Sequence, residues 1–147
     1  MVGMKIGRIL KSERKITLTE ELLVEYYSGA LKNSDALIEE SNLLFKNKSY
    51  ARCYFLACSS IEESGKAVEA FLGLGRNLTD PAVQKTLIQN FEDHNKKLLS
   101  ALMTLLSKPP FPIDKLDLIT DISLQLFQGR EKSLYTDINK SEITIPK

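Results

Sequence analysis

The chain has 147 residues, 43% of them hydrophobic, which suits a single globular domain with its own core. Its 20 Lys and Arg residues nearly balance 19 Asp and Glu, so the net charge is +1. That balance argues against bulk electrostatic capture of nucleic acid or membrane, but not against a local basic site. A metal site is not expected, because there is one histidine and no Cys-x-x-Cys motif.

The two cysteines, Cys53 and Cys58, fall about 140° apart around one predicted helix, so they cannot easily bridge each other. They are typical of small buried side chains in a reducing cytosol. No segment reaches the apolar length of a membrane span, and the basic N-terminus lacks the apolar stretch of a signal peptide. We therefore expect a cytoplasmic protein with no membrane segment.

The first elements in chain order are an arm and two long helices. Residues 1–18 alternate basic and aliphatic side chains and are expected to form a flexible or short-helical arm. Thr19 is a plausible N-cap for a helix that runs to Lys46. A break at Asn47-Lys48 precedes a second helix, which runs from about Ser49 and ends before Gly75.

Thr79-Asp80-Pro81 predicts the start of a third helix, which we expect to continue to about Leu105. Prolines between 109 and 112 stop it, and a fourth helix is expected from about Ile113. The tail, residues 138–147, reads as extended or loose, with no strong strand pattern. Short connections favour antiparallel neighbours, so residues 19–137 predict an all-α, antiparallel up-and-down four-helix bundle.

One carboxylate stands out within the second helix. Advancing by about 100° per residue places Glu62 on the apolar stripe of that helix. A carboxylate aimed at a core is costly unless it is paired or protonated. The local explanation is an i,i+4 ion pair between Glu62 and Lys66, in the favourable order.

A wider explanation uses the next two helices. His94 and Arg130 lie on the apolar stripes of the third and fourth predicted helices, and in a bundle these faces converge with that of Glu62. Taken singly, His94 is typical of a hydrogen-bonded core residue and Arg130 of a buried stem that reaches solvent. Taken together they suggest a shared polar pocket that could hold a phosphate. Four further residues are expected at its edge: Lys66, Lys97, Tyr135 and Asp137.

Three segments resemble a known family. Residues 51–66 (ARCYFLACSSIEESGK) look like the "RA…LA…EE.GK" helix of AbiV-type abortive infection proteins. Residues 91–97 (FEDHNKK) look like that family's "F.DH..K" segment, and residues 130–137 (REKSLYTD) resemble its "R…LYVD" segment. The three occur in family order. The resemblance implies the fold of the HEPN class, small helical bundles that often dimerise and many of which are metal-independent RNases in phage defence.

The resemblance implies catalytic roles for Arg130, His94 and Glu62, binding roles for the four edge residues, and no cofactor. It departs from the HEPN RNase pattern in one respect, because Arg130 is followed by Tyr135 and Asp137 rather than by a histidine. His94 would have to supply the base. Two functions stay open: an endoribonuclease of phage defence, acting as a homodimer on RNA or with a phage or cellular protein, or a non-catalytic module that binds a protein or nucleotide.

Overall fold

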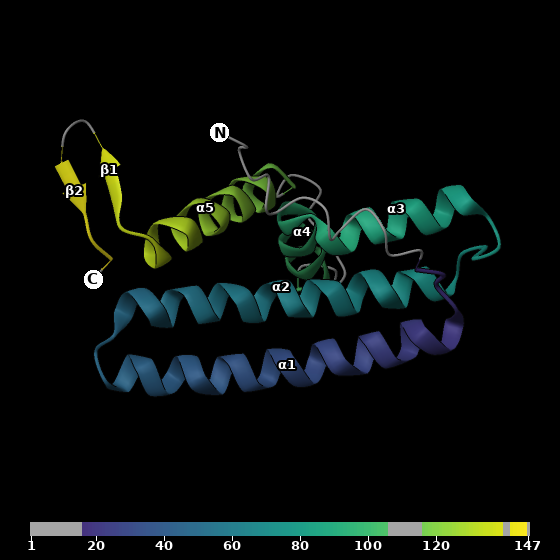
Figure 1. The fold of residues 1–147 in the computed structure, drawn as a ribbon, viewed down its shortest axis with the longest axis horizontal. Coiled ribbons are helices and arrows are strands. Elements are labelled where there is room, and N and C mark those ends of the chain that lie inside the picture. Colours follow the sequence, from purple (N-terminus) through teal and green to yellow (C-terminus); the bar gives the residue numbers. More distant parts are fainter. Residues whose placement is uncertain (1–15, 106–115, 140–141, 147) are drawn as a thin grey trace, which may run out of the picture.

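The computed structural model describes residues 16–105, 116–139 and 142–146 (Figure 1). These residues form five helices and one short hairpin: α1 (Glu20–Lys46), α2 (Tyr50–Leu74), α3 (Pro81–Glu92), α4 (His94–Leu105), α5 (Leu116–Leu134), β1 (Asp137–Asn139) and β2 (Glu142–Thr144). The prediction of a helical domain is confirmed. Residues 1–15 of the predicted arm (1–18) lie outside the described residues, and so does the predicted start of the last helix before residue 116.

Helices α1 and α2 form a long antiparallel hairpin, with caps close to where the sequence predicts them. Thr19 Oγ1 accepts a hydrogen bond from the backbone N–H of Leu22, 3.2 Å away. Small polar residues join the two helices. Ser34 Oγ lies 2.9 Å from both Ser60 Oγ and Ser64 Oγ, so the backbones approach closely without leaving a polar group unpaired.

The prediction of one continuous third helix is wrong. The helix that Asp80 and Pro81 start ends at Glu92, because Asp93 adopts an extended backbone (φ −80°, ψ 113°). Asp93 then starts α4: its Oδ1 accepts from the N–H of Lys96 at 3.1 Å, and its carbonyl accepts from the N–H of Lys97. A local capping interaction therefore outweighs the apolar periodicity that runs through this segment.

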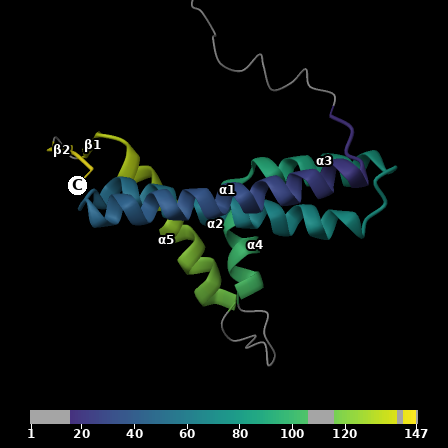
Figure 2. The ribbon, with the colours of Figure 1, turned by 90° about the horizontal axis from the view of Figure 1, so that it is seen from below.

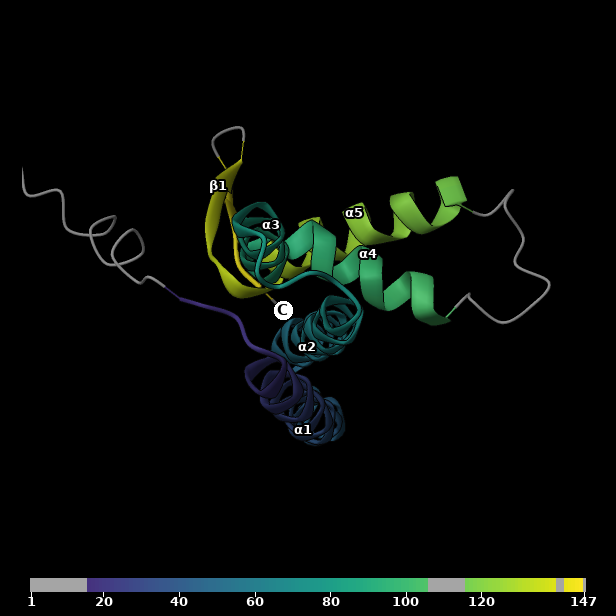
Figure 3. The ribbon, with the colours of Figure 1, turned by 90° about the vertical axis from the view of Figure 1, so that its right-hand side faces the viewer.

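Helices α4 and α5 do not align with the α1–α2 hairpin. They project from α2 at a steep angle, side by side, as Figures 2 and 3 show. The antiparallel up-and-down bundle is therefore not the arrangement observed. In the end-on view α1 lies at the edge of the molecule, with α2 between it and the α4–α5 pair (Figure 3).

The largest apolar cluster joins α1, α2 and α3. Leu23, Ala70 and Leu87 are fully buried there, and Tyr26 packs on Phe91 with ring centroids 4.7 Å apart. Leu18, which the sequence assigns to the arm, is buried in this cluster.

The tail contains a strand pair that the sequence does not predict. β1 pairs with β2 in antiparallel register, Ile138 opposite Ile143. With only three residues per strand, the alternation is too short to register as a sequence pattern.

Candidate functional site between α2, α4 and α5

Glu62 of α2 is the centre of a charged cluster. It is only 5% exposed. Its Oε2 lies 2.6 Å from His94 Nδ1 and 3.5 Å from Lys97 Nζ, both on α4. Its Oε1 lies 3.2 Å from Arg130 Nε on α5. One buried carboxylate thus joins three basic side chains from two other helices, as the sequence predicts for His94 and Arg130.

The break at Asp93 orients the α4 members of this cluster. His94 is the first residue of α4, and Lys97 follows one turn later, so both lie on one face. The same aspartate that ends α3 thereby turns an imidazole and an ammonium group toward Glu62. This gives a physical reason for the spacing of the FEDHNKK segment.

Gly65 brings α4 close enough to reach Glu62. A Cβ atom built on Gly65 would lie 1.8 Å from the backbone oxygen of Lys97. Since the obstructing atom is backbone, no side-chain rotation could relieve that clash. Glycine is therefore required at this helix contact, one turn beyond Glu62.

Arg130 is held on three sides. Besides Glu62, its Nη1 donates to Glu131 Oε1 at 2.6 Å, and its guanidinium carbon lies 4.9 Å from the ring centre of Phe55. Cation–π contact and ion pairing fix the plane of the group. The contact between Arg130 Nε and Glu62 Oε1 has ion-pair distance but not hydrogen-bond alignment, and both atoms are buried. Neither atom has a hydrogen-bond partner within the described part of the chain.

The cluster perturbs two titrating groups. Burial lowers the pKa of Lys97, and the charge of Lys66 lowers it further, whereas Glu62 opposes both effects. Burial also raises the pKa of the Cys58 thiol, so this cysteine stays protonated beside the cluster. Glu62 faces Lys97 and Arg130, and Glu131 also pairs with Arg130, so two carboxylates match the two basic groups when the lysine is protonated.

Comparison with protein families matches residues 22–147 to the AbiV model of the HEPN class, most of the chain. The chain belongs to the AbiV family of HEPN domains. This family assignment marks it as an abortive-infection, or phage-defence, domain. No curated protein and no solved structure matches it.

The remaining residues predicted for the site of this AbiV-family domain are Lys66, Tyr135 and Asp137. Lys66 pairs with Glu63, not with Glu62, so the predicted i,i+4 pair is wrong. Glu62 turns instead toward α4 and α5, where three basic groups converge. Tyr135 is 58% exposed, and its side chain has no hydrogen bond to the cluster among the described residues. Asp137 begins β1, and its side chain lies outside the described part of the chain.

Three contributors were not predicted from sequence. Phe55 supplies the ring under Arg130, Glu131 holds the other side of the guanidinium, and Gly65 permits the helix contact. Gly65 belongs to the family-like EESGK segment and could have been found there. Phe55 lies two turns before Glu62 on the same face of α2, but only the position of α5 reveals its role.

A second buried carboxylate lies two turns along α2. Glu69 is 6% exposed, and its oxygens accept from Asn90 Nδ2 and Ser100 Oγ. These neutral donors come from α3 and α4. We interpret Glu69 as a structural link between the three helices, because both its oxygens are satisfied within the fold.

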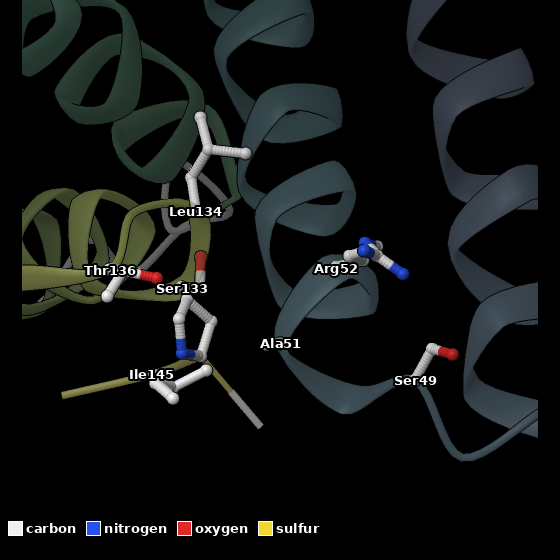
Figure 4. Close-up of a pocket in the computed structure, with 8 residues that line it drawn as sticks. Ser49, Ala51, Arg52, Ser133, Leu134, Thr136 and Ile145 are labelled. Carbon is white, nitrogen blue, oxygen red and sulfur yellow. The ribbon is translucent and has the colours of Figure 1, made fainter.

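One pocket of the fold is lined by none of the cluster residues. It holds about 380 Å³ between the start of α2, the end of α5 and the tail, and Ser133 and Thr136 are among its lining residues. Figure 4 shows the Arg52 side chain directed toward α1, away from Ser133 and Thr136. We therefore do not place an anion site in this pocket. Within the described residues there is also no group of His, Cys, Asp and Glu suited to a metal, and no helix long and apolar enough to cross a bilayer.

Proposed function

We propose that this AbiV-family domain defends against phage by cleaving RNA without a metal ion, using His94, Arg130 and Glu62. One observation carries the proposal: Glu62 joins His94 and Arg130 from two different helices, while the His94 side chain stays 43% exposed. An imidazole that is oriented by a carboxylate and open to solvent has the arrangement of a general base. The family assignment supports the setting of phage defence.

The orientation of His94 suits proton abstraction. When Nδ1 donates its hydrogen to Glu62, Nε2 carries the free lone pair. That nitrogen would take the proton of a ribose 2′-hydroxyl, whose oxygen then attacks the adjacent phosphorus. The bond to the 5′-oxygen breaks, leaving a 2′,3′-cyclic phosphate and a 5′-hydroxyl that takes a proton from solvent.

Arg130 would stabilise the charge that develops on the phosphate. Its guanidinium is fixed by Phe55 and Glu131, so little ordering is needed when the phosphate arrives. Lys97 adds a second positive group from the buried side. Lys66 lies close enough to affect the pKa of Lys97, and we propose that it contacts the RNA backbone. Tyr135 and Asp137 remain proposed binding residues that follow the end of α5.

The proposed setting is the cytoplasm, which is consistent with the two free cysteines, Cys53 and Cys58. The active form is proposed to be a homodimer whose activity is triggered by a phage or cellular protein. The family resemblance implies that the two Arg130 helices lie near the two-fold axis. In the fold, however, the charge of Arg130 is already balanced by Glu62 and Glu131, which weakens the reason for pairing there.

A second function is a non-catalytic module that binds a protein or nucleotide. Two observations favour it: the missing histidine on α5, and the near-complete burial of Glu62 and Lys97. The pocket described above is not lined by Glu62, His94 or Arg130. If the domain is such a module, the cluster would be a buried structural network that stabilises the fold.

Cleavage of single-stranded RNA in the presence of EDTA separates the two functions. Wild type, with lysate from phage-infected cells as activator, should yield products that end in a 2′,3′-cyclic phosphate. His94→Ala and Arg130→Ala should abolish that cleavage with unchanged helical content by circular dichroism. Lys96→Ala is the matched control, since Lys96 is exposed on α4 beside His94. If the wild type never cleaves RNA, or if His94→Ala cleaves normally, the nuclease proposal fails.

A further inference from the structure

The second buried carboxylate, Glu69, joins the two sides of the helix break at Asp93. Its Oε2 accepts a hydrogen bond from Asn90 Nδ2 at 2.8 Å, near the end of α3. Its Oε1 accepts from Ser100 Oγ, in the second turn of α4. Because Glu69 is only 6% exposed, these two donors replace water that the carboxylate has lost. One side chain of α2 therefore spans the break.

These two hydrogen bonds can form together only if the chain bends between their donors. In a continuous helix, Asn90 and Ser100 would lie about 15 Å apart along the axis and about 80° apart around it. One carboxylate could not accept from both side chains at that separation. In the fold α3 lies along the α1–α2 hairpin, whereas α4 projects away from it (Figure 2). The contacts of Glu69 therefore favour the bent arrangement over the continuous helix that the apolar periodicity predicts.

The bend also decides which residue faces Glu62. A continuous helix antiparallel to α2 would have Asn90 level with Glu69. Seven positions further along it, Lys97 would then be level with Glu62, and His94 would lie about one turn short. In the bent fold His94 Nδ1 instead lies 2.6 Å from Glu62 Oε2. The contact between His94 and Glu62 thus depends on the angle between α3 and α4.

Helix α2 holds α4 on both sides of their closest backbone approach. A Cβ atom on Gly65 would lie 1.8 Å from a backbone oxygen of α4, so the two helices touch at this point. Glu62 lies one turn before Gly65 on α2 and contacts His94. Glu69 lies one turn after it and holds Ser100. Contacts on both sides of this approach oppose rotation of α4 about its own axis.

We propose that Glu69 is a positioning residue for His94, which acts by keeping the break at Asp93 in the form that directs the imidazole toward Glu62. Glu69 itself has no hydrogen bond to the imidazole among the described residues. The cap at Asp93 is a single exposed interaction, so it is expected to share this task with Glu69. For its effect on RNA cleavage the inference rests on the function proposed above, but the position of His94 can be measured without any cleavage.

Two substitutions of Glu69 separate positioning from packing. Glu69→Met removes the acceptor and keeps a side chain of similar length, so it should release the bend. Glu69→Gln is the conservative variant. Its oxygen can accept from Ser100, and its amide can donate to Asn90 once the Asn90 amide is turned, so it should retain the bend.

Gln84→Met is the matched control on α3. Gln84 is also half-buried, and its side chain bonds to backbone groups of Leu18 and Leu78, none of which lies beyond the break. Its loss should lower the melting temperature and leave His94 in place.

Nitrogen NMR of the imidazole measures the position of His94, which is the only histidine in the chain. At a pH where the ring is neutral, wild type, Glu69→Gln and Gln84→Met should carry the hydrogen mainly on Nδ1, the nitrogen that faces Glu62. Glu69→Met should shift toward the mixture of tautomers that the same ring shows in urea. A wild-type imidazole spectrum in folded Glu69→Met would overturn the inference.

Milder variants decide the question if Glu69→Met does not fold. Ser100→Ala and Asn90→Ala each remove one donor, and each should move the imidazole signals in the direction of the urea spectrum. Asp93→Ala combined with Ser100→Ala should change the tautomer balance by more than the sum of the two single changes, because both interactions hold the same bend. Imidazole signals that stay at their wild-type positions in all these variants would show that Glu69 only stabilises the fold.

RNA cleavage connects the position of His94 to the proposed function. Glu69→Met should lower kcat at least about tenfold with little change in KM, because a displaced base slows the chemical step while the proposed RNA contacts remain. Glu69→Gln should keep most of the wild-type rate. If wild type cleaves no RNA, the proposed function fails, and the NMR result still decides the role of Glu69. If the imidazole shifts in Glu69→Met while cleavage is unchanged, Glu69 positions His94 but His94 is not the base.

Discussion

Glu62 Oε2 lies 2.6 Å from His94 Nδ1, and the helix break at Asp93 places His94 where this contact can form. Because α3 ends and α4 begins at Asp93, the imidazole of His94 points toward α2. The pair has the geometry of a carboxylate-oriented histidine. The helix break at Asp93 also explains why His94 lies beside the buried carboxylate of Glu62.

Glu62→Ala should lower the free energy of unfolding by roughly 3–5 kcal/mol, because it strands Lys97, which is 4% exposed, and leaves Arg130 without its buried counter-charge. Urea denaturation measures this. Glu63→Ala is the control: Glu63 pairs with Lys66, which is more exposed than Lys97, and its loss should cost about 1 kcal/mol or less. Equal losses for the two variants would contradict a buried charge network.

Gly65→Ala should destabilise the domain by roughly 1–3 kcal/mol or more, because the new Cβ would force α4 away from α2 at Lys97. The same displacement should separate His94 from Glu62 and reduce any RNA cleavage. Gly29→Ala makes the same change in α1, where a Cβ meets nothing within 4 Å, and should be stabilising by about 0.5–1 kcal/mol. Thermal denaturation of the two variants should therefore shift in opposite directions.

Alkaline pH should lower the free energy of unfolding of the domain, in part because Tyr26 ionises. Burial, with a further effect of the Glu63 charge, raises the pKa of Tyr26 to about 12. The unfolded chain loses this proton near pH 10 and the folded chain near pH 12, so the folded state binds more protons between them. The free energy of unfolding should fall as pH rises through that window.

Tyr26→Phe should remove this part of the pH dependence. The difference in the free energy of unfolding between wild type and Tyr26→Phe should change by on the order of 1–3 kcal/mol between pH 9 and 12. Urea denaturation at a series of pH values measures it. Tyr50→Phe, at a 52% exposed tyrosine, should keep the wild-type slope. Parallel pH profiles for wild type and Tyr26→Phe would show that the raised pKa of Tyr26 does not contribute to the pH dependence of stability.

Inorganic phosphate or sulfate should raise the melting temperature if the cluster binds anions, because a ligand of the folded state stabilises it by mass action. Arg130→Lys keeps the charge but loses the planar stacking on Phe55, so it should reduce the gain in melting temperature. Chloride at equal ionic strength controls for general salt effects. No gain from phosphate in wild type would remove support for the anion site.

Phage challenge tests the site in cells. Cells that express Arg130→Ala should lose protection, whereas cells with Lys96→Ala should keep it, at matched protein levels. Equal protection by wild type and Arg130→Ala would remove Arg130 from the mechanism, whatever its role in folding.

The sequence by itself determined the features that arise within a few residues of each other. Thr19, and Asp80 with Pro81, specified helix starts through capping, and the 3.6-residue period placed Glu62 on the buried side of α2. The three family-like segments lie within residues 22–147, the part of the chain that matches the AbiV family. Asp93 was the exception: its capping potential was visible, but the apolar pattern that continues past it concealed the break.

Only the tertiary structure decided which groups Glu62 meets. The sequence offered both Lys66 one turn away and a pocket shared with His94 and Arg130, and in the fold the carboxylate pairs with His94, Lys97 and Arg130. That choice depends on how α4 and α5 cross α2 and on how closely they approach. The crossing angle and the distance between the helices result from the packing of all the side chains along them, including the space that Gly65 leaves. No local sequence pattern encodes this combined effect.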